Sequence, residues 1–408
     1  MTHREPAADR PTRALRPPRA VGYAYPWDFL DDPAAPGRAC ALGLDAVAVA
    51  AAYHTVRAAS PLHPARRLTE APYAACYVPI REEAWRGRRL RPARPTWLNS
   101  ADPFGEARGA LHAAGLQVYA WTVLTHNSRL GRANPDLTVR NAFGEHYPYA
   151  LCPAAEEVAD YCAALVREVV STGQPDGLVL EACGQLGVVH GGHHDKADLA
   201  GWTATQQRLL SLCFCTACER NYREAALDPG HLSAAVRHAL GPTGSADCVE
   251  DALGRQVATA LAGIRARTTE ELRSRTAAQA RAVDPGLRLV LHASPDPWAT
   301  GPFATVAAAA AGTTGPADAL VASCWQPGPT GTASLRGLRA TAGPGTRVGG
   351  YLLADASWDA GDTAERVAAY RDAGMDELHL YHLGLTGRAG LRRMAAILTA
   401  AGQEALPT

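Results

Sequence analysis

The sequence predicts a single (β/α)8 barrel, a TIM barrel, with long insertions after its second and fourth strands. Short apolar runs alternate with helical segments rich in Ala, Leu and Arg, which is typical of βα units that build a parallel sheet. Eight such units fit within 408 residues, because barrel domains run from ~200 to more than 400 residues. No Gly-rich dinucleotide fingerprint follows the first run, which disfavours an open nucleotide-binding sheet.

Composition indicates a globular protein, and the length is that of an enzyme. Hydrophobic residues make up 47% and charged residues 20%, so a large core can be buried. Forty basic and forty acidic side chains give a formal charge of zero, which argues against a nucleic acid or an anionic membrane as partner. Because no stretch approaches the ~18 apolar residues of a membrane span and no export signal is evident, we expect a cytoplasmic protein. The sequence is compatible with a homo-oligomer.

The eight predicted strands and their helices follow one another along the chain. We expect residues 1–19, which contain five arginines and several prolines, to be a disordered basic tail, and residues 20–408 to form one barrel domain with no second domain. The insertions span about residues 53–114 and 182–251. The strands are expected at Val21–Tyr25, Ala46–Ala51, Gln117–Leu124, Gly177–Glu181, Arg288–His292, Ala319–Cys324, Val348–Leu353 and Glu377–Tyr381, and helices at Pro153–Ser171, Ala252–Val283, Thr363–Ala373 and Gly390–Ala401.

Polar and aromatic residues follow the predicted strands where each strand ends. In a barrel, these positions converge on the catalytic face. Aromatic rings beside carboxylates, imidazoles and amides suit a polyhydroxylated substrate, since rings pack on C–H surfaces while polar groups bind hydroxyls. The expected substrate-binding residues at the strand ends are Tyr25, Trp27, Asp28, His54, His126, Asn127, His292, Trp325, Gln326, Trp358 and His382.

Glu181 is the leading catalytic candidate. It ends the otherwise apolar run GLVLE, so its carboxylate is expected to be buried near the mouth of the barrel. Desolvation favours the protonated form of a carboxylic acid, which suits a general acid that works near neutral pH. The alternative reading is an ion pair that closes the barrel mouth.

Three cysteines form a C-x-C-x-x-C cluster: Cys213, Cys215 and Cys218. Closely spaced thiolates supply most of a tetrahedral zinc site, and a structural site needs a fourth ligand. Cys152 and Cys183 are the candidates for that ligand. We therefore expect a structural Zn²⁺ rather than a catalytic one, with three free thiols as the alternative.

The loop VVHGGHHDK follows the fourth strand and contains His190, His193 and His194. Its glycines allow sharp turns, and a loop after a strand lies on the catalytic face. We expect these histidines to contact substrate over the barrel mouth. Binding of a second metal by His190 and His194, or no function, are the alternatives.

With these residues in view, the stretch from about residue 151 to 222 resembles the zinc-binding β-galactosidases of glycoside hydrolase family forty-two. The shared order is a Cys-Pro entry to a helix, a strand that ends in a glutamate, and C-x-C-x-x-C; here it reads LCPAAEEV, DGLVLEACG and CFCTAC. The resemblance implies that Cys152, Cys213, Cys215 and Cys218 bind zinc and that Glu181 is the proton donor.

The sequence also departs from that family. The family's Asn-Glu pair is Leu180-Glu181 here, the HGGHHDK loop separates the glutamate from the cysteines, and Asp355 ends the seventh strand where the family has a glutamate nucleophile. We expect none of the family's additional C-terminal domains in residues 20–408.

Three functional readings follow. The first is a glycoside hydrolase-like enzyme acting on a small carbohydrate, in which Glu181 and Asp355 face each other across the mouth. The second is a lyase or isomerase that uses its many histidines, with or without a metal. The third is a catalytically silent sugar-binding barrel.

Overall fold

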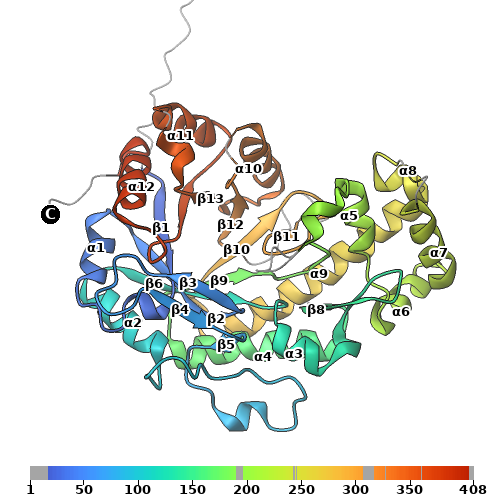
Figure 1. Cartoon of the computed structure of the whole chain (residues 1–408), viewed down its shortest axis with the longest axis horizontal. Helices are drawn as coiled ribbons and strands as arrows, with labels where there is room; N and C mark the ends of the chain where they lie inside the picture. The colour runs from blue at the N-terminus through green and yellow to red at the C-terminus, as the bar shows by residue number, and fades with distance from the viewer. Residues whose placement is uncertain are drawn as a thin grey trace, which may run out of the picture.

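The computed structural model describes residues 17–189, 196–241, 244, 246–306, 317–326, 328–359 and 361–403. Its centre is a closed barrel of eight parallel strands, as the sequence predicts (Figure 1). Each strand pairs with its neighbours, and the last strand pairs with the first to close the ring. In chain order the strands are β1 (Arg19–Ala24), β2 (Ala46–Tyr53), β6 (Gln117–Val123), β9 (Gly177–Glu181), β10 (Arg288–Ser294), β12 (Ala319–Ser323), β13 (Arg347–Leu353) and β14 (Glu377–Tyr381).

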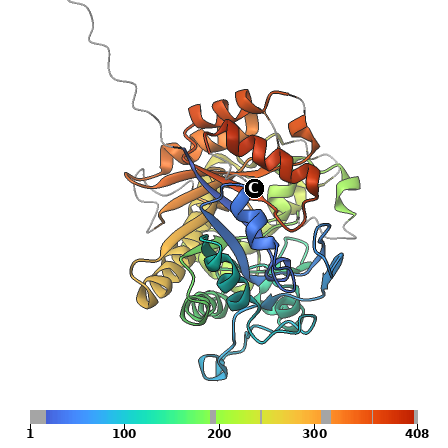
Figure 2. The same ribbon diagram turned by 90° about the vertical axis from the view of Figure 1, so that its left-hand side faces the viewer.

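The barrel strands are buried almost throughout because helices cover their outer faces. Every residue of β2 and β9 is buried, which explains why these strands read as continuous apolar runs. The surrounding helices include α1 (Ala35–Ala41), α2 (Pro103–Ala113), α4 (Glu156–Gly173), α9 (Arg255–Val283), α10 (Pro329–Thr341), α11 (Thr363–Asp372) and α12 (Arg388–Ala400). Figure 2 shows α1 and α12 side by side on the outside of the barrel.

The helix expected at Ala252–Val283 is interrupted near its start. Gly254 adopts a φ of 84° and separates α8 (Val249–Leu253) from α9. A left-handed residue cannot continue a right-handed helix, and glycine adopts that conformation at little cost.

Three loops after strands are elaborated, one more than expected. The loop after β2 contains β3 (Val56–Ala59), β4 (Leu68–Ala71), β5 (Ala75–Cys76) and η2 (Glu82–Trp85). The loop after β6, which the sequence analysis did not single out, contains α3 (Ser128–Ala133), η3 (Pro135–Leu137) and the hairpin of β7 (Thr138–Arg140) with β8 (His146–Leu151). The short strand β11 (Ala304–Thr305) and the 3-10 turns η1 (Pro26–Asp28) and η5 (Ala356–Asp359) complete the other loops.

The insertion after β9 is helical and has its own apolar core. It contains η4 (Ala197–Ala200), α5 (Ala204–Leu210), α6 (Thr216–Glu224), α7 (Pro229–Ala239) and α8, which lie beside the barrel in Figure 1. With the first half of α9 these helices enclose a second hydrophobic cluster, separate from that of the barrel. Its buried members are Ala142, Leu209, Leu212, Phe214, Tyr222, Leu232, Val236, Val249, Ala258, Leu261, Ile264 and Trp298.

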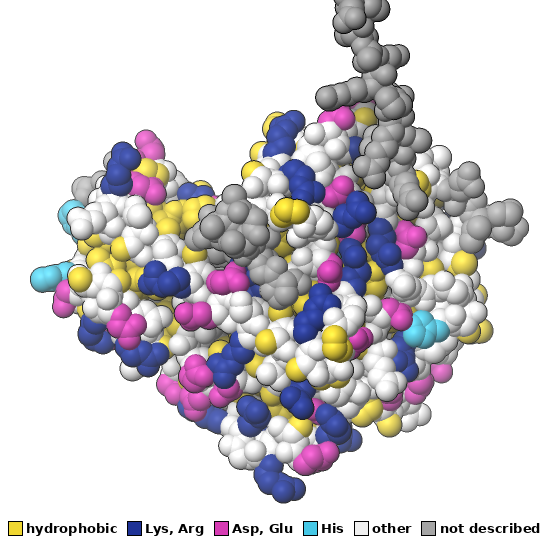
Figure 3. All heavy atoms as spheres, turned by 180° about the vertical axis from the view of Figure 1, so that it is seen from behind, with side chains coloured by type: hydrophobic (Ala, Val, Ile, Leu, Met, Phe, Trp, Pro, Cys, Tyr) yellow, Lys and Arg dark blue, Asp and Glu magenta, His cyan; other side chains and the backbone are white. Residues whose placement is uncertain are grey.

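The expected tail boundary needs correction at its end. Arg19 is the first residue of β1 and is paired in register with Glu377 of β14, so the barrel begins one residue earlier than predicted. Residues 1–16 lie outside the described residues. None of the described helices combines the length and hydropathy needed to cross a bilayer. On the rear surface, basic and acidic side chains are interspersed (Figure 3), in keeping with a formal charge of zero.

Candidate active site

Glu181 lies at the carboxyl end of β9 and is buried, as expected. Trp121 of β6 donates a hydrogen bond from Nε1 to Glu181 Oε2 at 2.8 Å. His292 of β10 places its Nδ1 atom 3.2 Å from the same oxygen. The carboxylate is thus held from both neighbouring strands, which is the geometry of a positioned acid or base rather than of a solvated surface group.

Aromatic rings from five strands surround Glu181. The ring of Trp121 lies 4.5 Å from that of Tyr53 and 5.0 Å from that of Tyr23. Burial, followed by neighbouring charges that include Glu181, raises the pKa of Tyr23, Tyr53, Tyr351 and Tyr381, so these phenols stay neutral. The result is an apolar, aromatic environment around one carboxylate.

Trp325 supplies an aromatic face that solvent can reach. Its side chain is 39% exposed, and its ring lies 5.0 Å from Tyr381 and stacks at 5.9 Å on Tyr351. Gln326 beside it is exposed. Both residues are therefore accessible to a ligand, and their contact with a substrate stays a prediction.

His382 is held as a neutral hydrogen-bond donor. Its Nδ1 accepts from the backbone N–H groups of Gly384 and Leu385 at 3.2 and 3.3 Å, so the proton of the neutral ring must be on Nε2. Burial lowers the pKa of His382 to about 3, which keeps the ring uncharged. Among the described residues no group accepts from Nε2, although the atom is buried.

Several other buried polar atoms of this region share this property. Trp27 Nε1 and Tyr351 Oη have no hydrogen-bond partner in the described part of the chain. Trp27 stacks on Tyr25 at 4.4 Å, and Tyr25 lies 4.3 Å from the ring of His382. Buried polar atoms are normally satisfied, so these three are available to water or to a bound ligand.

His54 and His126 form a stacked pair, with ring centroids 4.2 Å apart. Burial lowers the pKa of His54, and the charge of Glu181 opposes that effect, so His54 lies within the electrostatic reach of the site. Asn127, by contrast, caps α3: its Oδ1 accepts from Leu130 N at 3.0 Å. The structure therefore gives Asn127 a local structural role.

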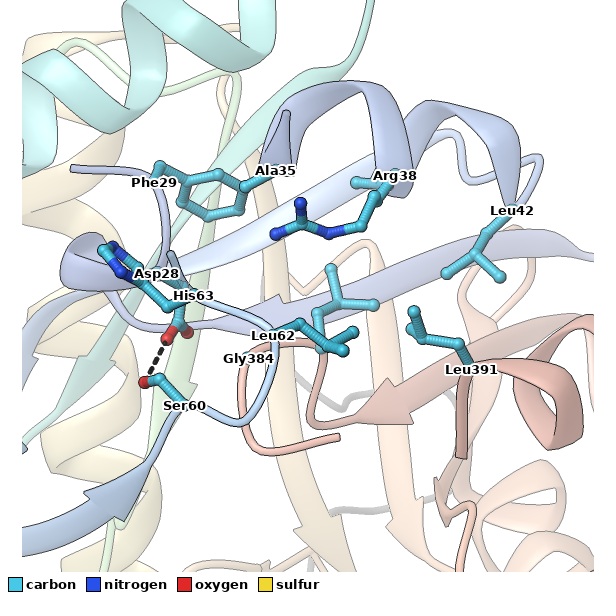
Figure 4. A pocket seen from close by; sticks show the side chains of 12 residues that line it. Asp28, Phe29, Ala35, Arg38, Leu42, Ser60, Leu62, His63, Gly384 and Leu391 are labelled. Atoms are coloured by element: carbon cyan, nitrogen blue, oxygen red, sulfur yellow. Dashed lines mark hydrogen bonds between the residues drawn. The ribbon is translucent and has the colours of Figure 1, made fainter. Parts of the chain in front are cut away.

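Asp28 lines a small pocket between α1 and the start of α12, and its Oδ2 lies 3.9 Å from His382 Nδ1. Figure 4 shows its carboxylate directed at Ser60, whose hydroxyl donates to it at 3.4 Å. The cavity measures about 40 Å³, and burial raises the pKa of Asp28 to about 7. Gly384 is needed there, since a Cβ at this position would lie 2.0 Å from the carboxylate.

Two of the expected site residues are placed elsewhere. Asp355 is exposed, and its Oδ1 accepts from the backbone N and the hydroxyl of Ser357 at 2.9 and 2.6 Å. Its charge acts on Arg393 of the outer helix α12, so the expectation that it faces Glu181 is wrong for this structure. Trp358 is buried in η5, donates to Leu353 O and packs under the guanidinium of Arg366 at 4.4 Å, which makes it a core residue.

The four cysteines of the expected zinc site come together. The sulfur atoms of Cys152, Cys213, Cys215 and Cys218 all lie within 4.8 Å of one another. A tetrahedral zinc with Zn–S bonds of about 2.3 Å requires sulfur separations of about 3.8 Å, so the donor set fits the metal. Hydrogen bonds from the other three sulfurs lower the pKa of Cys215, which favours the thiolate.

The cysteine cluster ties the insertion to the loop before α4. Cys152 follows β8, whereas Cys213 and Cys215 lie between α5 and α6. Arg140 of β7 reinforces the link, because its side chain donates to Phe214 O and pairs with Glu219 at 2.9 Å. Cys183, the other candidate ligand, lies 3.9 Å from Thr276 Oγ1 and outside the cluster.

The histidine loop falls outside the described residues: His190, His193 and His194 are not placed. Within the part of the chain that is described, no second group of three metal-binding side chains occurs. The expected contact of this loop with substrate therefore remains a prediction.

Sequence reasoning missed most of the residues that surround Glu181. Tyr23, Trp121 and Tyr351 lie within their strands rather than at the strand ends. The sequence does contain a signal for them, since polar or aromatic residues occur at every second position of a strand, as in Tyr23 and Tyr25 or in Glu377, His379 and Tyr381. Alternate residues of a barrel strand face the interior, so this spacing places such side chains in one line.

No protein-family model matches the chain, and no curated protein matches it. Solved structures do resemble it. The catalytic domain of β-amylase from Paenibacillus polymyxa has a TM-score of 0.57 at 12% identity, with 95% of this chain and 99% of that chain covered. α-L-Fucosidase isoenzyme 2 from Paenibacillus thiaminolyticus has a TM-score of 0.56 at 15% identity, over 94% of this chain and 49% of that one.

A family forty-two β-galactosidase from G. stearothermophilus is also similar, with a TM-score of 0.53 and 11% identity over 94% of this chain and 56% of that one. The chain thus spans about half of the fucosidase and of the galactosidase. At these identities the likeness establishes the barrel fold alone. Family forty-two is one of several kinds of enzyme with this fold.

Proposed function

We propose that the chain is a glycoside hydrolase-like enzyme that acts on a small carbohydrate, with Glu181 as its general acid and base. The observation that carries this proposal is the placement of one buried carboxylate at a strand end, held by Trp121 and His292 and enclosed by aromatic rings. Active sites of barrel enzymes lie on this face.

The surroundings of Glu181 suit a sugar. The exposed ring of Trp325 offers a flat face for C–H groups, and His382 Nε2, Tyr351 Oη and Trp27 Nε1 are buried polar atoms that a ligand's oxygen atoms could satisfy. Two of these three can only donate, so hydroxyl, acetal or carbonyl oxygens of the ligand are their natural partners.

The mechanism needs a second group besides Glu181, and Asp355 does not provide it in this structure. One protein carboxylate suffices where a substituent of the sugar itself attacks the anomeric carbon, as in substrate-assisted hydrolysis. We therefore favour substrates with such a neighbouring group. The contact between His292 and Glu181 also supports the alternative of a lyase or isomerase that moves protons without hydrolysis.

We further propose that Cys152, Cys213, Cys215 and Cys218 hold one structural Zn²⁺. The metal would fix the insertion against the barrel and would leave the chemistry to Glu181, because four thiolates complete its coordination.

A panel of aryl glycosides, with and without a 2-acetamido group, tests the function. Glu181→Gln should lower kcat by ~10²- to 10⁴-fold on any active substrate, the usual contribution of a general acid or base. Glu224→Gln changes an exposed residue of α6 and is the control, which should have the same activity as the parent protein. Full turnover by Glu181→Gln would overturn the role of Glu181. Sugar binding without turnover of any glycoside would favour a silent barrel.

A further inference from the structure

A line of polar side chains runs through the interior of the barrel from Glu181 to its opposite end. Tyr23 Oη lies 2.9 Å from His292 Nε2 and 3.0 Å from His379 Nδ1. His379 Nε2 lies 3.4 Å from Glu377 Oε2, and Arg288 pairs with Glu377. At the other end, His292 Nδ1 lies 3.2 Å from Glu181 Oε2.

This line replaces the branched apolar side chains that usually fill barrel interiors. All five of its members from Glu181 to Glu377 are buried. Gly349 of β13 makes room for it, since a Cβ there would lie 2.8 Å from the ring of His379. The link between His292 and Glu181 is short enough for a hydrogen bond but not aligned as one, so a small ring rotation is needed to complete it. Catalytic hydrogen bonds are often poorly aligned in the absence of substrate.

We propose that Glu181, His292, Tyr23 and His379 share one proton, which rests either on Glu181 or on His379. With the proton on Glu181, each group donates toward Glu377: Glu181 to His292 Nδ1, His292 Nε2 to Tyr23, Tyr23 to His379 Nδ1, and His379 Nε2 to Glu377. With His379 doubly protonated, His379 donates both to Glu377 and to Tyr23, Tyr23 to His292 Nε2, and His292 Nδ1 to the Glu181 carboxylate.

The two arrangements contain the same four protons on these groups and leave no bond of the line unmade. Removing one proton leaves three protons for the four contacts of the line, so at one contact two lone pairs must face each other. Such a repulsive contact is costly in a buried site. The line therefore favours a Glu181 that holds, or can recover, its proton.

The charges that face the line come from several strands. Arg288 compensates Glu377, and burial lowers the pKa of His379 while Glu377 opposes that effect. Burial of His379 thus disfavours the arrangement in which this ring is doubly protonated. The titratable and charged groups that face the line are Arg19 and Tyr23 of β1, Tyr119 of β6, Glu181 of β9, Arg288 and His292 of β10, Tyr351 of β13, and Glu377, His379 and Tyr381 of β14.

The catalytic consequence rests on the proposed function. When the glycosidic C–O bond breaks, Glu181 gives its proton to the leaving oxygen and the line is left one proton short. A water molecule then adds its hydroxyl group to the anomeric carbon of the sugar or of the intermediate. Its remaining proton goes to Glu181, which restores the four-proton state. His292, Tyr23 and His379 are thus positioning residues that act through Glu181.

Infrared spectroscopy of the whole protein tests the shared proton without any substrate. A carboxylic-acid band that disappears in Glu181→Gln identifies protonated Glu181, and its pH midpoint can be followed in variants. Tyr23→Phe breaks the line, leaves His292 free to donate to the carboxylate, and should move the midpoint to lower pH by about one unit, a tenfold change in proton affinity. Tyr119→Phe removes a hydroxyl from the same barrel interior outside the line and should leave the midpoint in place.

His379→Gln gives the opposite expectation. Glutamine can accept from Tyr23 and donate to Glu377 but cannot hold the second proton, so the midpoint should stay or rise. Thermal unfolding of each variant shows whether it folds. The nitrogen chemical shifts of His292 should report a change of tautomer of this ring in Tyr23→Phe alone. Equal midpoints in the parent protein, Tyr23→Phe and His379→Gln would overturn the shared proton even if Glu181 proves essential for turnover. A band that responds as expected in a protein without glycosidase activity would support it and reject the proposed function.

Discussion

The barrel interior and the helical insertion hold themselves together in different ways. Inside the barrel, buried polar groups satisfy one another, and the closed sheet fixes them from every side. The insertion relies on a small apolar cluster and on four cysteines that hold it to the loop before α4. The barrel therefore carries its own stability, whereas the insertion would depend on the proposed zinc as well as on its apolar cluster.

Helix α9 belongs to both regions. Its first half contributes Leu261 and Ile264 to the cluster of the insertion, and its second half contributes Leu272 and Ala277 to the barrel core. With 29 residues it is about 44 Å long. Loss of order in the insertion should therefore stop part of the way along this helix.

The largest effect is expected from removing the metal site. Cys215→Ser should abolish tight zinc binding and unfold the insertion, since structural zinc contributes on the order of 10 kcal/mol to small sites. Hydrogen exchange should become fast in α5 to α8 and stay slow in β9 and β10.

Cys248→Ser is the matched control, because Cys248 lies in the same insertion but outside the cluster. It should bind one zinc per chain. Full zinc content and an unchanged melting temperature in Cys215→Ser would show that the insertion is held by its apolar cluster alone.

Cavity-forming changes sharpen the comparison at the next level. Leu261→Ala and Leu320→Ala each remove a fully buried side chain and should cost about 2 to 5 kcal/mol. Leu261→Ala should loosen the insertion locally, seen as new protease cleavage there, whereas Leu320→Ala should lower the midpoint of global unfolding. If both variants lost the same amount of global stability, the barrel and the insertion would unfold as one unit.

The pH dependence of stability tests the small pocket of Asp28. The pKa of Asp28 is about 7 in the folded protein and about 4 in the unfolded chain, so between these values only the folded state keeps the proton. Stability should thus fall as pH rises from 4 to 7, by at most about 4 kcal/mol. Asp28→Asn should remove this slope in urea unfolding, while the exposed change Asp31→Asn should keep it. A parallel slope in Asp28→Asn would refute the assignment.

The smallest effect on stability is expected at the exposed ring of Trp325. Trp325→Ala should change stability by less than about 0.5 kcal/mol, yet weaken binding of a carbohydrate ligand by about tenfold. Trp202→Ala, at 37% exposure in the insertion, removes a similar ring from the other region. Titration calorimetry should find its affinity unchanged. Equal losses in both variants would place the ligand elsewhere.

The barrel could be predicted because each strand is a short apolar run followed by a helical segment. All eight expected strands overlap the observed ones, and the cysteine spacing anticipated the cluster that Cys152 completes. Glu181 was recognised because a charged residue at the end of a buried strand has few ordinary explanations.

The partners of Glu181 were harder to foresee. A side chain two to five residues past a strand end can face the mouth, a pocket or an outer helix, and the local sequence does not decide which. Asp355 turned to Ser357, Trp358 to Arg366, and Asp28 to Ser60. The line from Glu181 to Glu377 joins four strands that are distant in sequence, so only the closed barrel brings its members together.

The pairing of β1 with β14 has a kinetic meaning. Arg19 near the start of the described chain is in register with Glu377 near its end, so the ring cannot close during synthesis until the last strand has left the ribosome. Until then β1 and β13 each present an unpaired edge that can associate with other chains. His379 lies on that same strand, so the buried polar line cannot form before β14 is in place.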